Sequence, residues 1–435
     1  MHNNPYPHHH LHRGIMKKTI AILLVAVLAV SSVFAGFSLS GEANVKLVGN
    51  FDDKTLGFIN GQNQVKVTIE GATAEKVNEG DIYAGIKATL AFKAATKKTT
   101  DPVSPKDNPV TSIDFDVDKL EISEAYITDG NWKVSILSAA KTPTFAKGWE
   151  TVKEGNDKKD VVLSVAVGNK VPGLTVEYAG WKVGAGLNVE FEGKKDGMLT
   201  FATPSFAFDA VTVKAGAGAA NKDGKLTVGG GAEAKYATDA FVASVAADAV
   251  YGKDGNTFDA AVRANVSYAP VTVDAFFATK TDLKNTFVTY DDRAYKYDSG
   301  AKENYLSAKV ACDLNSFDVP VTLTAVGIDL VKDQYFDVEA KATISGVNGT
   351  VFGGYQISNK TYHVGVAADY TLEKVGKIYG QFDLSGDSAL KAAKVKVGVE
   401  NTTLVSGATL KLEYAGVDFV AKKAGAVTAS AQIKF

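Results

Sequence analysis

Apolar and polar residues alternate along most of the chain, in runs of about ten residues. In the run 181–192, every second residue from Trp181 to Phe191 is apolar, and the residues between them are polar or Gly. Because successive side chains of a strand point to opposite faces, such a run predicts a strand with one apolar and one polar face. Similar runs occupy residues 37–47, 82–92, 225–236, 240–251, 258–268, 305–314, 335–346, 361–371, 391–400 and 404–414. Their length suits a tilted strand that crosses a membrane better than an average soluble strand.

The residues between these runs favour tight turns. Gly and Asn, which tolerate the positive φ of hairpin turns, recur at 193–197, 221–224, 252–256 and 348–349. No segment has a helical period over a dozen residues. Consecutive hairpins predict an antiparallel meander, and closure into a barrel removes its exposed edges. We therefore expect an all-β fold in one domain, a single large antiparallel up-and-down transmembrane β-barrel of about 20–24 strands.

The number of strands is less well determined than their pattern. Counting back from the C-terminus places residues 280–304 outside the cell, and counting forward from Phe37 places 94–111 and 140–159 outside. The two counts differ by one strand, although a single-chain bacterial barrel has an even number. Residues 143–153, which contain Phe145 and Trp149, are the leading suspect for a missed or mistaken strand.

The apolar phase is expected to face outward, towards lipid. More than sixteen strands enclose a lumen too wide for side chains to fill, so an apolar inner wall would have nothing to pack against. Tyrosines that close strands in the apolar phase suit an interfacial girdle, although Tyr also favours strands in any sandwich. These tyrosines are Tyr178, Tyr236, Tyr251, Tyr268, Tyr370 and Tyr414.

The polar phase is expected to line a water-filled lumen. It carries both signs of charge along the same wall, which suits a pore of mild ionic selectivity. For any single residue a solvated face without a transport role is the commoner explanation, so the inference depends on the set. The candidate pore-lining residues are Lys182, Glu190, Lys214, Glu233, Lys235, Arg263, Lys309, Glu339, Lys341, Lys394, Lys396, Glu400, Lys411 and Glu413.

The first 35 residues have the pattern of an export signal rather than of the barrel. Lys17 and Lys18 precede an apolar run over 20–30, and small residues lead to a cleavage site between Ala35 and Gly36. We expect a signal peptide over 16–35, an upstream artefact or alternative start over 1–15, and a mature barrel over 36–435. The histidines at 8–12 are not expected to form a metal site.

Composition narrows the function further. Removal of 1–35 takes three of the 47 basic residues and none of the 49 acidic ones, so the mature chain is acidic and no nucleic-acid partner is expected. Cys312 is the single cysteine and His363 the single histidine of the mature chain, which excludes an intrachain disulfide and a cysteine metal site. No cofactor is expected. After residue 35 no apolar stretch is long enough for a spanning helix.

With these features placed, the chain resembles bacterial outer-membrane porins. The local motif is Glu121-x-x-Glu124-Ala125-Tyr126, and residues 427–435 alternate up to a terminal Phe. The resemblance implies a porin in the outer membrane, in contact with lipid, that passes small hydrophilic solutes. It also implies that the barrel-assembly machinery reads Ile433 and Phe435, so deletion of Phe435 should impair assembly, and it leaves a homotrimer open. The Lys, Ala and Val bias is similar to spirochaete surface-abundant proteins.

The chain also departs from the porin pattern, and rival functions stay open. Arg263 and Arg293 are the two arginines after residue 35, so no arginine ladder can be built at a constriction. Segment 140–159 or 280–304 is expected to fold into the pore, whereas Asp291, Asp292 and Arg293 are expected at a solvated loop tip.

The main function expected is passive diffusion of small hydrophilic solutes, without enzymatic activity. A barrel hydrolase would need His363 with Ser358 or Asp369, because a nucleophile requires a base. An adhesin would use polar loops at 50–63, 94–111 and 280–304. A substrate-specific channel would use inward aromatics such as Phe352 and Tyr379, which form no ladder.

Overall fold

The computed structural model describes most of the chain after the expected signal peptide. The described residues are 36–58, 64–72, 80–97, 112–136, 142–154, 157–161, 173–189, 195–222, 224–252, 255–281, 287–290, 293–296 and 303–434. Within these ranges no helix has the length and apolar character needed to span a membrane. The cleavage site at Ala35, the candidate pore residue Glu190 and the terminal Phe435 lie outside the described residues.

One antiparallel sheet of 24 described strands forms the wall of the molecule. Its strands are β1 (Gly36–Asn50), β2 (Thr55–Phe58), β3 (Gln64–Ala72), β4 (Tyr83–Lys97), β5 (Ser112–Thr128), β6 (Trp132–Ile136), β9 (Gly173–Tyr178), β10 (Trp181–Val189), β11 (Lys195–Ala202), β12 (Phe206–Phe208), β13 (Val211–Lys222), β14 (Lys225–Ala237), β15 (Phe241–Gly252), β16 (Thr257–Tyr268), β17 (Val271–Lys280), β20 (Glu303–Asp313), β21 (Val321–Ile328), β22 (Tyr335–Ile344), β23 (Val347–Gln356), β24 (Thr361–Leu372), β25 (Gly376–Gly386), β26 (Leu390–Asn401), β27 (Ala408–Asp418) and β28 (Ala426–Lys434). A short 3₁₀ helix, Leu314–Phe317, joins β20 to β21.

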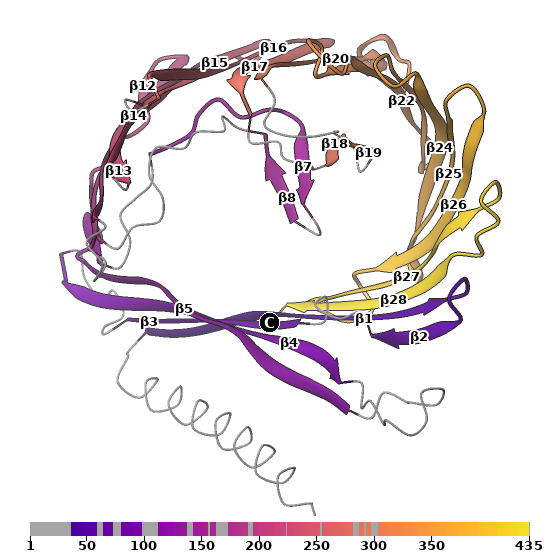
Figure 1. Cartoon of the computed structure of the whole chain (residues 1–435), viewed down its shortest axis with the longest axis horizontal. Helices are drawn as coiled ribbons and strands as arrows, with labels where there is room; N and C mark the ends of the chain where they lie inside the picture. Colours follow the sequence, from indigo (N-terminus) through magenta and orange to yellow (C-terminus); the bar gives the residue numbers. More distant parts are fainter. Residues whose placement is uncertain are drawn as a thin grey trace, which may run out of the picture.

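The sheet closes on itself, so the wall is a barrel (Figure 1). β28 pairs with β1 in a register that joins Lys434 to Glu42 and Ala426 to Asn50, and this pair closes the barrel. β2 and β3 both pair with β1, and β11 and β12 both pair with β13, so each of these two pairs fills one strand position. The described wall therefore has 22 strand positions, which confirms the predicted up-and-down barrel of 20–24 strands.

A second, smaller sheet lies inside the barrel. It contains β7 (Thr151–Glu154), β8 (Asp157–Asp160), β18 (Phe287–Tyr290) and β19 (Arg293–Lys296), and Figure 1 shows these strands within the ring. β18 pairs with β7, so the connection between β6 and β9 meets the connection between β17 and β20. Both predicted candidates for a segment inside the pore therefore enter it.

This inner sheet corrects one expectation. Residues 143–153 do not form a strand of the wall, because 143–150 have no strand structure and β7 belongs to the inner sheet. Arg293 begins β19 and pairs with Tyr290 of β18, and its position at a solvated loop tip stays a prediction. Asp291 and Asp292 lie outside the described residues.

The outer face of the barrel is apolar, as predicted. Large apolar side chains of the outward phase are widely exposed, among them Val245, Val262 and Val351 at 54%, 41% and 60% of their surface. Strand directions place Tyr178, Tyr236, Tyr268 and Tyr370 near the end where β1 begins, and Tyr251 and Tyr414 near the other end. An apolar band between two tyrosine belts is the architecture of a protein that spans the bacterial outer membrane.

Aromatic rings lie flat against inward glycines of the wall. Gly398 pairs with Tyr379 across β25 and β26, and a Cβ at position 398 would collide with the Tyr379 ring. Gly85 and Tyr126 have the same relation across β4 and β5. The ring covers the bare backbone in each pair, which lets a large side chain sit on the lumen wall without projecting far into it.

Candidate functional site: the barrel lumen and its inner segment

The inner face of the wall carries charges, many of them in ion pairs between neighbouring strands or within one strand. Lys182 Nζ lies 2.9 Å from Glu177 Oε2, Lys214 Nζ 3.1 Å from Glu233 Oε1, and Lys411 Nζ 2.9 Å from Glu413 Oε2. Further pairs are Lys341 with Glu339 at 2.9 Å and Arg263 with Asp274 at 2.6 Å. Because each pair sums to zero charge, these contacts give the lumen wall little net field.

The candidate pore residues within the described ranges fall on the polar face of their strands. The alternation and register of the strands also place five residues on this face that are not in the ion pairs given above: Lys235, Lys309, Lys394, Lys396 and Glu400. The structure does not bring all these residues together, because they are spread around the barrel. Lys214 and Lys309 lie next to aromatic rings of residues 142–150, whereas the candidates on β25 to β27 belong to another part of the wall (Figure 1).

The inner segment, defined here as the described residues 142–154 and 157–161, is fixed to the wall by buried polar contacts. The buried Asp248 carboxylate accepts the backbone N–H of Phe145 at 2.9 Å and that of Ala146 at 2.7 Å. Arg263 Nη1 donates to the carbonyl of Lys147 at 3.2 Å, while its Nε and Nη2 donate to Asp274. Backbone groups of a loop are thus paired with charged side chains of the wall, and such bonds are stronger than neutral ones.

The wall under the first residues of the inner segment is built from glycines. A Cβ at Gly216 would lie 2.9 Å from the Pro143 ring, and one at Gly218 would collide with the Thr142 hydroxyl. A Cβ at Gly231 would lie 2.9 Å from the Phe145 ring. We call Gly216, Gly218 and Gly231 the glycine floor. A larger residue at any of these positions would come closer to the segment than van der Waals contact allows, and at Gly231 it would also collide with Asp248 and the Ala247 carbonyl of the wall.

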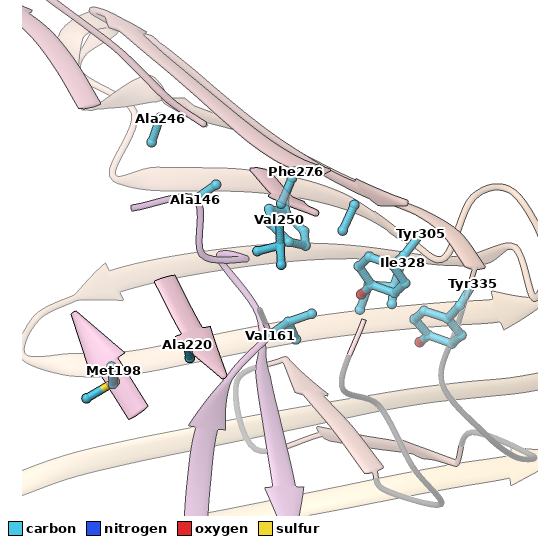
Figure 2. Packing of buried hydrophobic residues seen from close by; sticks show 12 residues of the cluster. Ala146, Val161, Met198, Ala220, Ala246, Val250, Phe276, Tyr305, Ile328 and Tyr335 are labelled. Atoms are coloured by element: carbon cyan, nitrogen blue, oxygen red, sulfur yellow. The ribbon is translucent and has the colours of Figure 1, made fainter. Parts of the chain in front are cut away.

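Apolar packing completes the contact surface between the inner segment and the wall, which we call the seat. Ala146 and Val161, at 0% and 1% exposure, pack with wall residues in one buried cluster, as Figure 2 shows. The wall contributes Met198, Ala220, Ala246, Val250, Ala261, Phe276, Ala278, Tyr305, Ile328 and Tyr335 to this cluster. The Phe145 ring lies 5.8 Å from Lys214 Nζ and the Trp149 ring 5.5 Å from Lys309 Nζ. Two candidate pore lysines therefore contact aromatic rings of the inner segment, in cation–π geometry.

Glu150 is the most deeply buried acid of the seat. Its side chain accepts a short hydrogen bond from the Tyr305 hydroxyl of β20, and the Ser307 hydroxyl faces the same carboxyl. Burial raises the pKa of Glu150 above its ordinary value, the two hydroxyls act in the opposite direction, and the charge of Asp274 raises it further. The inner segment thus holds a carboxyl that binds a proton more readily than an exposed Glu does.

The surroundings of His363 differ from the prediction. Its Nε2 lies 2.9 Å from Asp337 Oδ2, and its ring stacks on Tyr335 with centroids 5.9 Å apart. Neither predicted partner is correct, because Ser358 accepts from Gln356, and Asp369 faces Lys377 at 3.8 Å. Within the described residues, no group of three or more His, Cys, Asp or Glu side chains is placed to hold a metal ion.

Apart from Arg263, the residues that fix the inner segment were missed in the sequence. Asp248 falls in the polar phase of its run, but nothing in one strand shows that a loop about a hundred residues away binds it. The glycine floor could have been noticed in the sequence, because Gly216, Gly218 and Gly231 also stand in the polar phase, which faces the lumen. Glycine at an inward position marks a close approach of another backbone.

Comparisons with known proteins identify no family for this chain. No family model matches it, and no curated protein matches it. Among solved structures, Pseudomonas aeruginosa OprD is 10% identical with a TM-score of 0.39, over 93% of this chain and 95% of that one. Pseudomonas aeruginosa OccK9 (OpdG) has the same identity and TM-score, over 93% and 100%. The translocation pore of the P pilus usher PapC is 8% identical with a TM-score of 0.38, over 92% and 99%.

Proposed function

We propose that the barrel is an outer-membrane porin through which small hydrophilic solutes diffuse passively. The observation that supports this most is the combination of an apolar outer face with a charged inner face around a lumen that the inner segment fills on one side. A closed wall of 22 strand positions is too wide for its own side chains to fill. Solutes would pass between the inner segment and the wall formed by β24 to β28 and β1.

Weak ionic selectivity is part of the proposal. On the open wall Lys411 pairs with Glu413 and Lys377 faces Asp369, so cations and anions meet both signs of charge. A strongly selective pore needs an excess of one sign at its narrowest part. The described ion pairs give no such excess.

Single-channel recording of refolded protein in planar bilayers tests the proposal. We expect step conductance and, across a KCl gradient, a reversal potential that is small compared with the Nernst potential. Lys411→Gln should shift the reversal potential towards cations, because Glu413 loses its partner, and Val397→Ala on the outer face is the matched control. Absence of step conductance would refute the channel, and a reversal potential near the Nernst limit would refute weak selectivity.

A substrate-specific channel is the second candidate, and the fixed inner segment favours it. A loop held by Asp248 and Arg263 gives the passage a defined shape, which is a condition for recognising one solute. Saturable block of the current by a sugar or an organic anion, with linear flux of other solutes, would favour this candidate over general diffusion.

We also propose that residues 16–35 are a cleaved signal peptide and that the barrel-assembly machinery inserts the mature chain. The basic residues and apolar run before Ala35 support the first proposal, and the alternating strand β28 supports the second. Intact-mass measurement of protein from outer membranes tests cleavage directly. A mass that includes residues 16–35 would contradict it.

A further inference from the structure

Glu150 places a buried ionisable group at the contact between the inner segment and the barrel wall, and a fixed constriction does not need such a group there. The carboxyl is 1% exposed, and it sits at the point where the inner segment meets β20. A buried acid is stable as the neutral form, whereas its ionised form loses water without recovering an equivalent interaction unless a cation pairs with it. The charged groups around Glu150 therefore decide how the seat responds to protons.

No described side chain forms an ion pair with Glu150. From β20 it meets the Tyr305 and Ser307 hydroxyls, and from β17 the nearest charge is Asp274, which is an acid. Arg263 of β16 binds Asp274 and the Lys147 carbonyl. Of the nearby lysines, Lys309 of β20 lies against the Trp149 ring, and Lys147 is exposed on the segment itself.

We propose that Glu150 is a proton-controlled latch, which holds the inner segment on the wall when the carboxyl is protonated and lets it detach more often when the carboxyl is ionised. The barrel wall stays intact in both states, because Glu150 belongs to no strand of it. The latch adds a form of regulation to the proposed channel, because the seated segment sets the width of the passage. The latch itself does not depend on the channel function. Only its effect on current rests on that proposed function.

The sign follows from linkage. Burial raises the pKa of Glu150 in the seated state, whereas the detached carboxyl returns to its ordinary value of 4.5. Seating is therefore strongest below about pH 4.5 and weakens as the pH rises towards the raised value, above which it stays constant. Within that window the ratio of detached to seated segment changes by up to about tenfold per pH unit.

The test is pulsed thiol labelling of a cysteine under the segment. Val161→Cys, in a background where Cys312 on the outer face is changed to Ala, places a thiol at a position of 1% exposure. A maleimide reaches it when the segment lifts. The same protein with Glu150→Gln is the matched control, because the amide keeps the shape and cannot ionise. Dividing the two labelling rates at each pH removes the pH dependence of the thiol itself.

We expect the labelling rate with Glu150 intact, divided by the rate in the Glu150→Gln control, to increase by severalfold or more from pH 4.5 to pH 8. A ratio that stays constant over this range overturns the latch. If Val161→Cys does not fold, Ala146→Cys gives the same measurement from the other side of Glu150. Single-channel recording is a second test. We expect more conductance substates at pH 8 than at pH 5 in the unmodified protein, and no such change in Glu150→Gln. Absence of any current would refute the channel and leave the labelling result to decide the latch.

Discussion

Asp248→Ala is expected to release the inner segment from the wall. In the structure both carboxylate oxygens face the backbone of the segment, with Oδ2 2.9 Å from Phe145 N and 2.7 Å from Ala146 N. These two N–H groups are the donors that the substitution leaves without their acceptor. The wall keeps its own backbone pairs with β14 and β16, so the substitution acts on the seat rather than on the barrel.

The size of the effect follows from the number of orphaned groups. A buried donor that loses its partner costs about 1–3 kcal/mol, so two of them cost about 2–6 kcal/mol. Since about 1.4 kcal/mol corresponds to a factor of ten, the lower limit already changes the seating equilibrium by roughly thirtyfold. Asp248→Asn keeps one acceptor oxygen and should give a smaller change, about 1–2 kcal/mol.

Maleimide labelling of Val161→Cys measures this equilibrium directly. The expected order of labelling rates is Asp248→Ala, then Asp248→Asn, then the unmodified residue, at a constant pH. Heat-modifiable mobility on a gel should show a folded barrel in all three. Equal labelling rates would refute the reasoning, because they would mean that water replaces the carboxylate at no cost and that Asp248 does not hold the segment.

Three further substitutions test the wall, each by urea titration of the folded band in lipid vesicles. Val245→Lys on the outer face should cost about 2–4 kcal/mol, whereas Ser244→Lys on the inner face should cost much less; equal costs would contradict the assignment of faces. Gly398→Ala should cost about 1–3 kcal/mol because its methyl group overlaps the aromatic ring packed on it, and an unchanged midpoint would contradict that contact. Arg263→Ala should cost about 3–5 kcal/mol by leaving the buried Asp274 unpaired, and adding Asp274→Ala should recover most of it; no recovery would show that the loss comes from elsewhere.

The wall was predictable from sequence because its rule is local. A period of two assigns each residue of a strand to one face, and the same rule that makes Val427 and Ala429 apolar makes Thr428 polar. Closure of such a meander then requires its first and last strands to pair, as β1 and β28 do. The inner segment obeys no such rule. Phe145 and Trp149 suggested a strand, but their rings pack on lysines of the inner wall instead.

The partners of single residues were harder to predict than their faces. His363 was correctly placed in the polar phase, but its partner Asp337 is 26 residues away and two strands back, on β22. In a meander, inward residues of neighbouring strands meet in an order set by register, and a turn whose length is uncertain by one residue changes every pair beyond it. Ser358 and Asp369 are closer to His363 in sequence, and proximity along the chain was the wrong criterion.

The glycine floor shows what additional information the sequence holds. A glycine costs conformational entropy in a strand, and an inward glycine facing only water gains no contact in return. Gly216, Gly218 and Gly231 therefore imply that something approaches the wall over β13 and β14, and the structure shows that Thr142, Pro143 and Phe145 do. A cluster of inward glycines on two neighbouring strands marks this contact, whereas a single inward glycine such as Gly398 is covered by an aromatic ring of the wall. The identity of the segment that fills this space cannot be inferred from the glycines, because glycine leaves room without favouring any side chain. The specific contacts with the segment come from Asp248, Arg263 and Tyr305.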